Sequence, residues 1–320
     1  MENRDPSKAR IYLTMFLAMI VMSFTSPLLK MALSLGATSE AVTLYRTIGV
    51  FILLLPVITL SPTKRAEVKG YSKKHWIMLF CLGTLKAFGM LSWIEGLKYT
   101  SVFVASTLTR TSPIWVIIGG YIFLREKTAL KAVGGMLLSF VGVALIGISD
   151  SAGGGNSWLG VVLLLFCSLI MAGDMLVNRI VRQSGSLWVT IFFIFLVASV
   201  ELLIYTFITG ANLGPFSPQV YAVIAGLTVF CTLWGQSVNV WVLKYMKAAT
   251  VSIIQLVSPF IAAFTAFMLL NEQPGVMTFI GAFVMMGGLF IYFREEAKAH
   301  HEEEQLAATE SVPVAGDDAS

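Results

Sequence analysis

Ten long apolar runs dominate this sequence and leave it few ways to fold. They cover approximately residues 11–35, 39–60, 75–97, 101–123, 128–149, 158–181, 187–209, 218–243, 247–270 and 275–293. A helix of roughly 20 apolar residues spans the hydrocarbon core of a bilayer, whereas the alternating strands of a membrane β-barrel need about 10. Because backbone N–H and C=O groups must be paired inside lipid, the runs predict an all-α integral membrane protein with ten transmembrane helices.

Charge is scarce, which agrees with a bilayer as the solvent. Charged residues make up 12% of the chain, against about 25% in soluble domains. Basic residues precede the first run, as in a signal peptide, but 11–35 is longer than the roughly 7–15-residue apolar segment of such signals. We therefore interpret it as a retained helix. The net charge of +4 is spread between the runs, so we expect the lipid bilayer, and not nucleic acid, as a partner.

The basic residues also orient the predicted helices. Of the 22 Lys and Arg residues, 17 lie at or near one set of helix ends and Lys98 alone lies at the opposite set. The remaining four, assigned to the interior of the spans, are Lys30, Arg46, Lys86 and Arg110. Loops rich in Lys and Arg stay on the cytoplasmic side. This asymmetry predicts a multi-pass protein of the plasma (inner) membrane with both termini in the cytoplasm.

The second half of the chain repeats the first at an offset of 146 residues. The segment "LKYTSVFVASTLTRTSPIWVIIGGYIFLREK" from Leu97 matches "LKYMKAATVSIIQLVSPFIAAFTAFMLLNEQ" from Leu243. The matched pairs include Ser112–Pro113 with Ser258–Pro259, Gly135 with Gly281 and Gly142 with Gly288. Because five helices are an odd number, the second copy must enter the membrane from the opposite side. Such inverted repeats are typical of secondary transporters, whose substrate site lies near the midplane between the halves.

The repeat divides the chain into four parts. We expect a first five-helix unit at 1–149, an external linker at 150–157, the inverted second unit at 158–293 and a disordered cytoplasmic tail at 294–320. The prediction of disorder depends on the charged residues, Ala and Gly that dominate the tail. "HHEEE" at 300–304 is interpreted as part of this tail, and no metal site is expected there.

The repeated segment resembles the drug/metabolite transporter (DMT) superfamily, and specifically the EamA-type family of ten-helix carriers. The likeness is carried by the Lys98–Tyr99 pair, the Ser-rich helix after it, Ser112–Pro113, Glu126 and the following glycine-rich helix. It covers nearly the whole chain except the tail. The resemblance implies a carrier that moves small metabolites, commonly amino acids or related compounds, without ATP. Arg110 departs from the family pattern, which mostly has a small or apolar residue there.

Polar residues inside the runs predict where a substrate binds. A charge at the centre of a span costs about 2.5–3.5 kcal/mol on insertion scales, so it is expected to face a cavity or the bundle interior. Helical spacing places these residues on shared faces. For single Ser and Thr residues helix packing is the alternative, and for Trp it is anchoring at the lipid interface. The substrate-binding candidates are Arg110, Lys86, Trp93, Asp174, Asn178, Trp234 and Gln255.

Arg110 is the residue most expected to select the substrate. It maps to Leu256 in the second half and so breaks the repeat. A guanidinium binds a carboxylate through two parallel hydrogen bonds, which Lys does less well. Because Lys86 is also deep and Asp174 is the one deep acid, we expect a positively charged cavity that attracts a carboxylate. An internal ion pair is the alternative role for Arg110, and Asp174 is the candidate for proton coupling or for contact with a substrate amine.

Five further residues are predicted to serve the scaffold. Pro113 and Pro259 lie mid-span at equivalent positions, where proline removes a helix hydrogen bond and permits a gating bend. The charged residues in the outer third of their spans are expected to form structural ion pairs. These are Lys30, Arg46 and Glu201.

The sequence therefore predicts a secondary transporter that works by alternating access, as a monomer or homodimer. We expect export or facilitated transport of amino-acid-like or other carboxylate-bearing small molecules. One alternative is an exporter of cationic drugs, for which a central Glu should dominate the charge. Another is an integral membrane enzyme or receptor. No Walker A, HExxH or GxSxG pattern occurs, so neither ATP hydrolysis nor other enzymatic activity is expected, and no metal or other cofactor.

Overall fold

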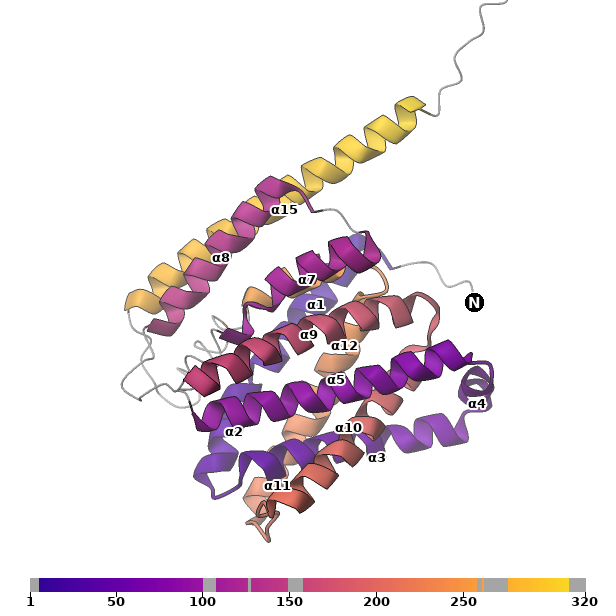
Figure 1. Cartoon of the computed structure of the whole chain (residues 1–320), viewed down its shortest axis with the longest axis vertical. Helices are drawn as coiled ribbons and strands as arrows, with labels where there is room; N and C mark the ends of the chain where they lie inside the picture. Colours follow the sequence, from indigo (N-terminus) through magenta and orange to yellow (C-terminus); the bar gives the residue numbers. More distant parts are fainter. Residues whose placement is uncertain are drawn as a thin grey trace, which may run out of the picture.

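The computed structural model describes residues 6–99, 108–125, 128–148, 158–257, 261 and 276–310. Every element within these ranges is helical, which confirms the all-α prediction for them (Figure 1). The elements are α1 (Lys8–Ser23), α2 (Thr25–Ser34), α3 (Ser39–Leu60), α4 (Pro62–Lys69), α5 (Lys73–Lys98), α7 (Ser112–Gly119), η1 (Gly120–Leu124), α8 (Leu130–Ile148), α9 (Trp158–Ser184), α10 (Leu187–Thr209), α11 (Pro218–Gly226), η2 (Leu227–Trp234), α12 (Gly235–Val242), α13 (Ala248–Ile254), η3 (Gln255–Val257) and α15 (Val276–Glu310).

Six helical segments within the described ranges are long and apolar enough to cross a membrane. They are Lys8–Ser34, Ser39–Leu60, Lys73–Gly96, Trp158–Ser184, Leu187–Thr209 and Pro218–Val242. Three shorter apolar helices, Ser112–Leu124, Leu130–Gly142 and Ala248–Val257, lie within the other predicted runs or overlap them. Large apolar side chains such as Phe207 and Phe123 are exposed on the outer surface, as expected for helices that face lipid. The chain is therefore a multi-pass membrane protein.

The first predicted span is broken in its middle. α1 ends at Ser23 and α2 starts at Thr25, with Phe24 between them. Pro27 has no N–H to donate to the carbonyl of Ser23, and its ring crowds that carbonyl, which weakens the helix at this point. The break lies beside the cavity described below, whose wall includes Ser23 and Thr25.

The eighth predicted span contains a stretch of π-helix, which is wider than an α-helix. Its backbone forms an α-helix in α11, a π-helix in η2 and an α-helix again in α12. At the start of α12, a Cβ added to Gly235 would lie 2.4 Å from Cγ of Met22. Glycine therefore lets α1 approach α12 closely at this level, and α1 packs against both η2 and α12.

Helices α8 and α15 pair along their lengths at one side of the molecule (Figure 1). A Cβ added to Gly142 would lie 2.3 Å from the backbone N of Met285, and one added to Gly288 would lie 2.4 Å from the backbone N of Ser139. The Ser139 hydroxyl donates to the Met285 carbonyl at 3.1 Å. Glycine thus permits backbone-to-backbone contact, the usual way in which membrane helices pack tightly.

α15 continues well past the predicted membrane boundary and ends at Glu310. Residues 294–310 of the tail expected to be disordered are described as helix, whereas residues 311–320 lie outside the described part. The segment is rich in Glu and Ala, which are strong helix formers. Lys298 and Glu295 form an ion pair one helical turn apart at 3.1 Å, and Lys247 lies 2.9 Å from Glu296. These contacts favour helix where composition alone suggested disorder.

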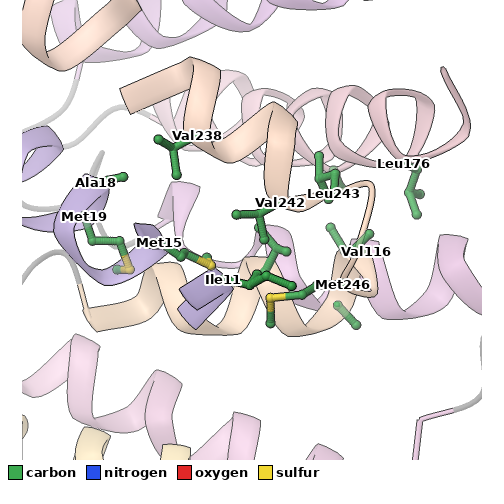
Figure 2. Packing of buried hydrophobic residues seen from close by; sticks show 14 residues of the cluster. Ile11, Met15, Ala18, Met19, Val116, Leu176, Val238, Val242, Leu243 and Met246 are labelled. Carbon is green, nitrogen blue, oxygen red and sulfur yellow. The ribbon is translucent and has the colours of Figure 1, made fainter. Parts of the chain in front are cut away.

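A buried apolar cluster joins α1, α7, α9, α12 and α13. Figure 2 shows side chains of α1, among them Ile11 and Met15, gathered with Val242 of α12 and with Val116 and Leu176. Ile11 directly follows the basic residue Arg10. The cluster therefore lies toward the helix ends that carry the excess of basic residues.

Candidate functional site

A cavity of about 380 Å³ lies inside the bundle. Its wall is formed by residues of α1, α2, α3, α5, α9, α12 and α13, by the turn before α7 and by Gln255 of η3. Ligand pockets typically measure about 300–1,000 Å³, so this cavity has room for a small metabolite. The wall includes apolar and methionine side chains together with four charged residues: Arg46, Lys86, Arg110 and Asp174.

Most of the residues predicted to bind substrate meet in this cavity. Six of the seven line it, and they come from four separate parts of the chain. Trp234 does not; it lies at the end of η2 with 40% of its surface exposed. The six lining residues are Lys86, Trp93, Arg110, Asp174, Asn178 and Gln255.

Lys86 and Asp174 form an ion pair across the cavity wall. Nζ of Lys86 lies 3.7 Å from Oδ2 of Asp174 and donates a hydrogen bond to Oε1 of Gln236 at 3.3 Å. The amide nitrogen of Asn178 donates to the backbone carbonyl of Asp174 at 3.0 Å, which secures the adjacent turn of α9. Oδ1 of Asp174 is buried without a hydrogen-bond partner. The pair is electrically neutral and leaves one carboxylate oxygen available.

Arg110 has no acidic partner among the described residues. Its Nη1 donates to the backbone carbonyl of Gln255 at 3.4 Å, and its Nε is buried without a partner. The Gln255 side chain turns to Asn239, where Nε2 donates to Oδ1 at 3.5 Å. The guanidinium therefore has no counter-ion among the described residues and keeps part of its donor capacity at the cavity wall.

The residues predicted to form structural ion pairs lie apart. Arg46 lines the cavity, and its Nε is buried without a hydrogen-bond partner. Glu201 lies on α10 outside the cavity lining, where it accepts a hydrogen bond from Thr84 at 2.8 Å. No ion pair joins Arg46 to Glu201 in the described part of the chain. Lys30 belongs to α2, and its side chain lies outside what the structure describes.

Sequence reasoning missed the polar face of α12. Gln236 and Asn239 line the cavity, whereas Trp234, the candidate predicted from the same span, does not. The π-helical turns of η2 hold more residues per turn than an α-helix, so they rotate the face that follows. Spacing of three residues between Gln236 and Asn239 was the available signal.

The two prolines can be compared only in part. Pro113 is buried in the first turn of α7, two residues after Thr111, which ends the Arg110–Thr111 turn. Proline is well tolerated at such a helix start because its missing N–H has no helical partner there. Pro259 lies outside the described residues.

The apolar cluster closes the cavity at the end rich in basic residues. Met19, Leu243 and Val251 belong to both the cluster and the cavity wall. Beyond them, Arg179 of α9 donates from Nη1 to the backbone carbonyls of Leu243 at 2.7 Å and Lys244 at 3.0 Å. This end of the bundle is therefore held by both apolar packing and hydrogen bonds.

The donor set of the cavity fits an organic anion better than a metal ion. The cavity presents guanidinium, ammonium, amide and indole groups, and a single carboxylate. In the described residues no group of three or more His, Cys, Asp or Glu side chains is placed to hold a metal.

Comparisons with known proteins identify relatives over most of the chain. The family model for EamA-like transporters matches residues 9–148 and 158–294. An uncharacterized transporter of Archaeoglobus fulgidus is 25% identical over 264 residues, covering 75% of this chain and 84% of that protein. An S-adenosylmethionine/S-adenosylhomocysteine transporter of Chlamydia trachomatis is 28% identical over 213 residues, covering 62% of this chain and 65% of that protein. A crystal structure superposes with a TM-score of 0.76 at 14% identity, covering 92% of this chain and 99% of that one, which shows a shared fold.

Proposed function

Because the chain belongs to the EamA-like transporter family, we propose that it is a secondary transporter that moves small carboxylate-bearing metabolites by alternating access. Amino acids and compounds like them are the expected substrates. We expect it to export these compounds, or to facilitate their diffusion, across the plasma (inner) membrane. The distribution of basic residues supports a cytoplasmic location for both termini.

The proposal includes ten spans arranged as two inverted five-helix units, 1–149 and 158–293, with residues 150–157 as the external linker. Two pairs of helix contacts support this arrangement, because shifting the residue numbers by 146 converts one contact of each pair into the other. Packing of α5 on α9 corresponds to packing of α12 on α1, and packing of α10 on α5 corresponds to packing of α3 on η2. Gly135 near Gly288 likewise exchanges with Gly281 near Gly142. Exchange of equivalent contacts is expected when two halves are related by a pseudo-two-fold axis.

Arg110 carries the substrate assignment. Its guanidinium lines the cavity, and no described acid neutralises it. A charge in the bundle interior is unfavourable unless it has a partner. A substrate carboxylate would provide that partner through two parallel hydrogen bonds.

The relative from Chlamydia trachomatis is named for S-adenosylmethionine and S-adenosylhomocysteine. Both compounds carry an amino-acid end with a carboxylate, so that name is compatible with an anion-binding Arg110. The cavity of about 380 Å³ is near the lower end of the range for ligand pockets. This size favours a compact substrate here.

Export of cationic drugs fits the cavity less well. The one acid described along the wall, Asp174, is already paired with Lys86. Three basic side chains line the same cavity: Arg46, Lys86 and Arg110. A permanent cation would therefore enter a positively charged cavity, which is unfavourable. An enzyme or receptor is disfavoured by the family and by relatives named as transporters.

Transport by purified protein in liposomes tests the assignment. Liposomes that contain the wild-type protein are loaded with one amino acid of a panel at a time, and the exchange of labelled substrate is measured. The same measurement is made for Arg110→Lys, Arg110→Gln and the exposed control Arg65→Gln. A hydrogen bond to a charged group contributes about 1.5–3 kcal/mol, so loss of the guanidinium should weaken carboxylate binding by roughly 10–100-fold. Unchanged exchange of every carboxylate by Arg110→Gln would remove Arg110 from the substrate site.

Asp174 is our candidate for proton coupling. Its Oδ1 is buried without a hydrogen-bond partner, and its other oxygen faces Lys86, so a proton or a substrate amine could compete for the carboxylate. Uptake driven by a pH gradient in the wild type, and lost in Asp174→Asn, would support this role. Exchange that ignores the gradient in the wild type would contradict it.

A further inference from the structure

A second unpaired arginine lines the same cavity. Arg46 extends from α3 and Arg110 from the turn before α7, and both have a buried Nε without a hydrogen-bond partner. Arg46 contributes no described hydrogen bond or ion pair to any acid, and Arg110 donates only to a backbone carbonyl. Since Lys86 and Asp174 neutralise each other, the charged side chains described along the cavity leave two positive charges.

The two guanidinium groups have different surroundings. Arg110 lies beside Gln255, whose side chain bonds to Asn239 of α12. Arg46 lines the cavity with its α3 neighbours Val42 and Thr43 and with residues of α2. Arg46 therefore belongs to the side of the cavity formed by α2 and α3, whereas Arg110 belongs to the side near α12 and η3.

The acid expected to neutralise Arg46 is engaged elsewhere. Glu201 accepts a hydrogen bond from Thr84 and is absent from the cavity wall. Two guanidinium groups that keep their charge inside a bundle repel an approaching cation and favour a ligand with matching negative charge. A ligand with one carboxylate would neutralise only half of this charge.

We propose that the substrate carries two separate anionic groups, one bound by Arg110 and the other by Arg46, as in an acidic amino acid or another dicarboxylate. This inference rests on the proposed function and narrows its substrate class. Arg46 is then a specificity-determining residue, because it distinguishes a second carboxylate from a neutral group of the same shape. Gln236 and Asn239 supply amide groups that can bind the part of the substrate between its two acidic ends.

Matched acid and amide ligands test this inference. Binding to the purified full-length protein is measured for glutamate against glutamine, aspartate against asparagine, and succinate against succinamate. Each pair differs mainly in one charge at nearly constant size. We expect the wild type to bind at least one diacid about 10-fold or more tightly than its monoamide, since a hydrogen bond to a charged group is worth at least that factor.

The arginine variants assign the two ends. The Arg46→Gln variant should bind the diacid and its monoamide with about equal affinity. Its affinity for the monoamide should be the same as that of the wild type. Arg65→Gln, on the exposed face of α4, should leave the preference unchanged. Arg46→Lys serves as a second variant, which retains the charge and should keep part of the preference if Arg46→Gln does not fold.

The outcomes separate the two proposals. Equal binding of acid and amide by the wild type overturns the two-anion inference and leaves a carboxylate transporter in place. The same inference fails if Arg46→Gln retains the full preference for the diacid. Failure of every carboxylate in the panel to bind would overturn the proposed function together with the inference.

Discussion

Nζ of Lys86 lies 3.7 Å from Oδ2 of Asp174, so an ion pair connects α5 to α9 at the wall of the central cavity. Both side chains are mostly buried, with 17% and 19% of their surfaces exposed. The two charges therefore act as one neutral unit. Among the described residues of the cavity wall, the remaining positive charge belongs to Arg46 and Arg110.

The ion pair predicts strong coupling between the two positions. Lys86→Met or Asp174→Asn alone should destabilise the protein, because each leaves a partly buried charge without its partner. The double variant should lose less stability than the sum of the two, with a coupling energy of about 0.5–3 kcal/mol. Thermal unfolding in detergent measures all four proteins. Additive losses would show that the two charges do not interact.

Trp93 and Trp234 should respond differently to a ligand. Trp93 lines the cavity, whereas Trp234 ends η2 outside it and is 40% exposed. Trp93→Ala should weaken ligand binding several-fold, because apolar contact contributes about 25 cal/mol per Å² of buried surface. Trp234→Ala should leave affinity unchanged. Isothermal titration calorimetry with a transported ligand measures the affinity of both variants. An equal loss of affinity in Trp93→Ala and Trp234→Ala would contradict the position of the cavity.

Two glycines of α8 should give opposite results on substitution by alanine. A Cβ at Gly142 would lie 2.3 Å from the backbone N of Met285, whereas one at Gly134 meets nothing within 4 Å. Gly142→Ala should therefore destabilise the protein by about 1–3 kcal/mol through overpacking. Gly134→Ala should be neutral, or stabilise by up to about 1 kcal/mol through helix propensity. Unfolding midpoints measure the difference, and a loss confined to Gly134→Ala would contradict the α8–α15 pairing.

Glu296 should contribute more stability than its neighbour Glu295. Glu296 pairs with Lys247 at the start of α13, and 15% of its side chain is exposed. Glu295 pairs with Lys298, an exposed residue of the same helix. Exposed pairs contribute about 0–1 kcal/mol, so Glu295→Gln should have almost no effect and Glu296→Gln a measurable one. Chemical unfolding of both variants tests this order; equal losses would mean that the contact with α13 does not stabilise α15.

The sequence predicted the helices well because a bilayer permits so few backbone structures. The apolar run 39–60 coincides with α3, and 187–209 coincides with α10. Composition was a poorer guide outside the membrane. The charges of 294–310 suggested disorder, although the same Glu and Ala residues form the end of α15.

The site was harder to predict where the backbone departs from regular helix. Lys86 and Trp93 lie on a continuous helix, α5, and ordinary spacing placed them on one face. Trp234 is the last residue of the π-helical stretch η2, and no residue pattern in the sequence indicated that the helix there would be wider. Arg46 was assigned to an ion pair because its depth matched that of Glu201. Depth along a helix does not determine the direction of a side chain, and Arg46 lines the cavity.

The glycine contact between α8 and α15 restricts which substitutions the protein can accumulate over time. Residues on the cavity wall, such as Arg110, are in contact with side chains that can themselves be substituted. At Gly142 or Gly288 the neighbouring atoms are backbone, and no side-chain substitution on the opposite helix can move a backbone atom away. Substitution along this contact is therefore limited by the fixed path of two backbones, whereas substitution on the cavity wall is limited only by neighbouring side chains, which can change in turn.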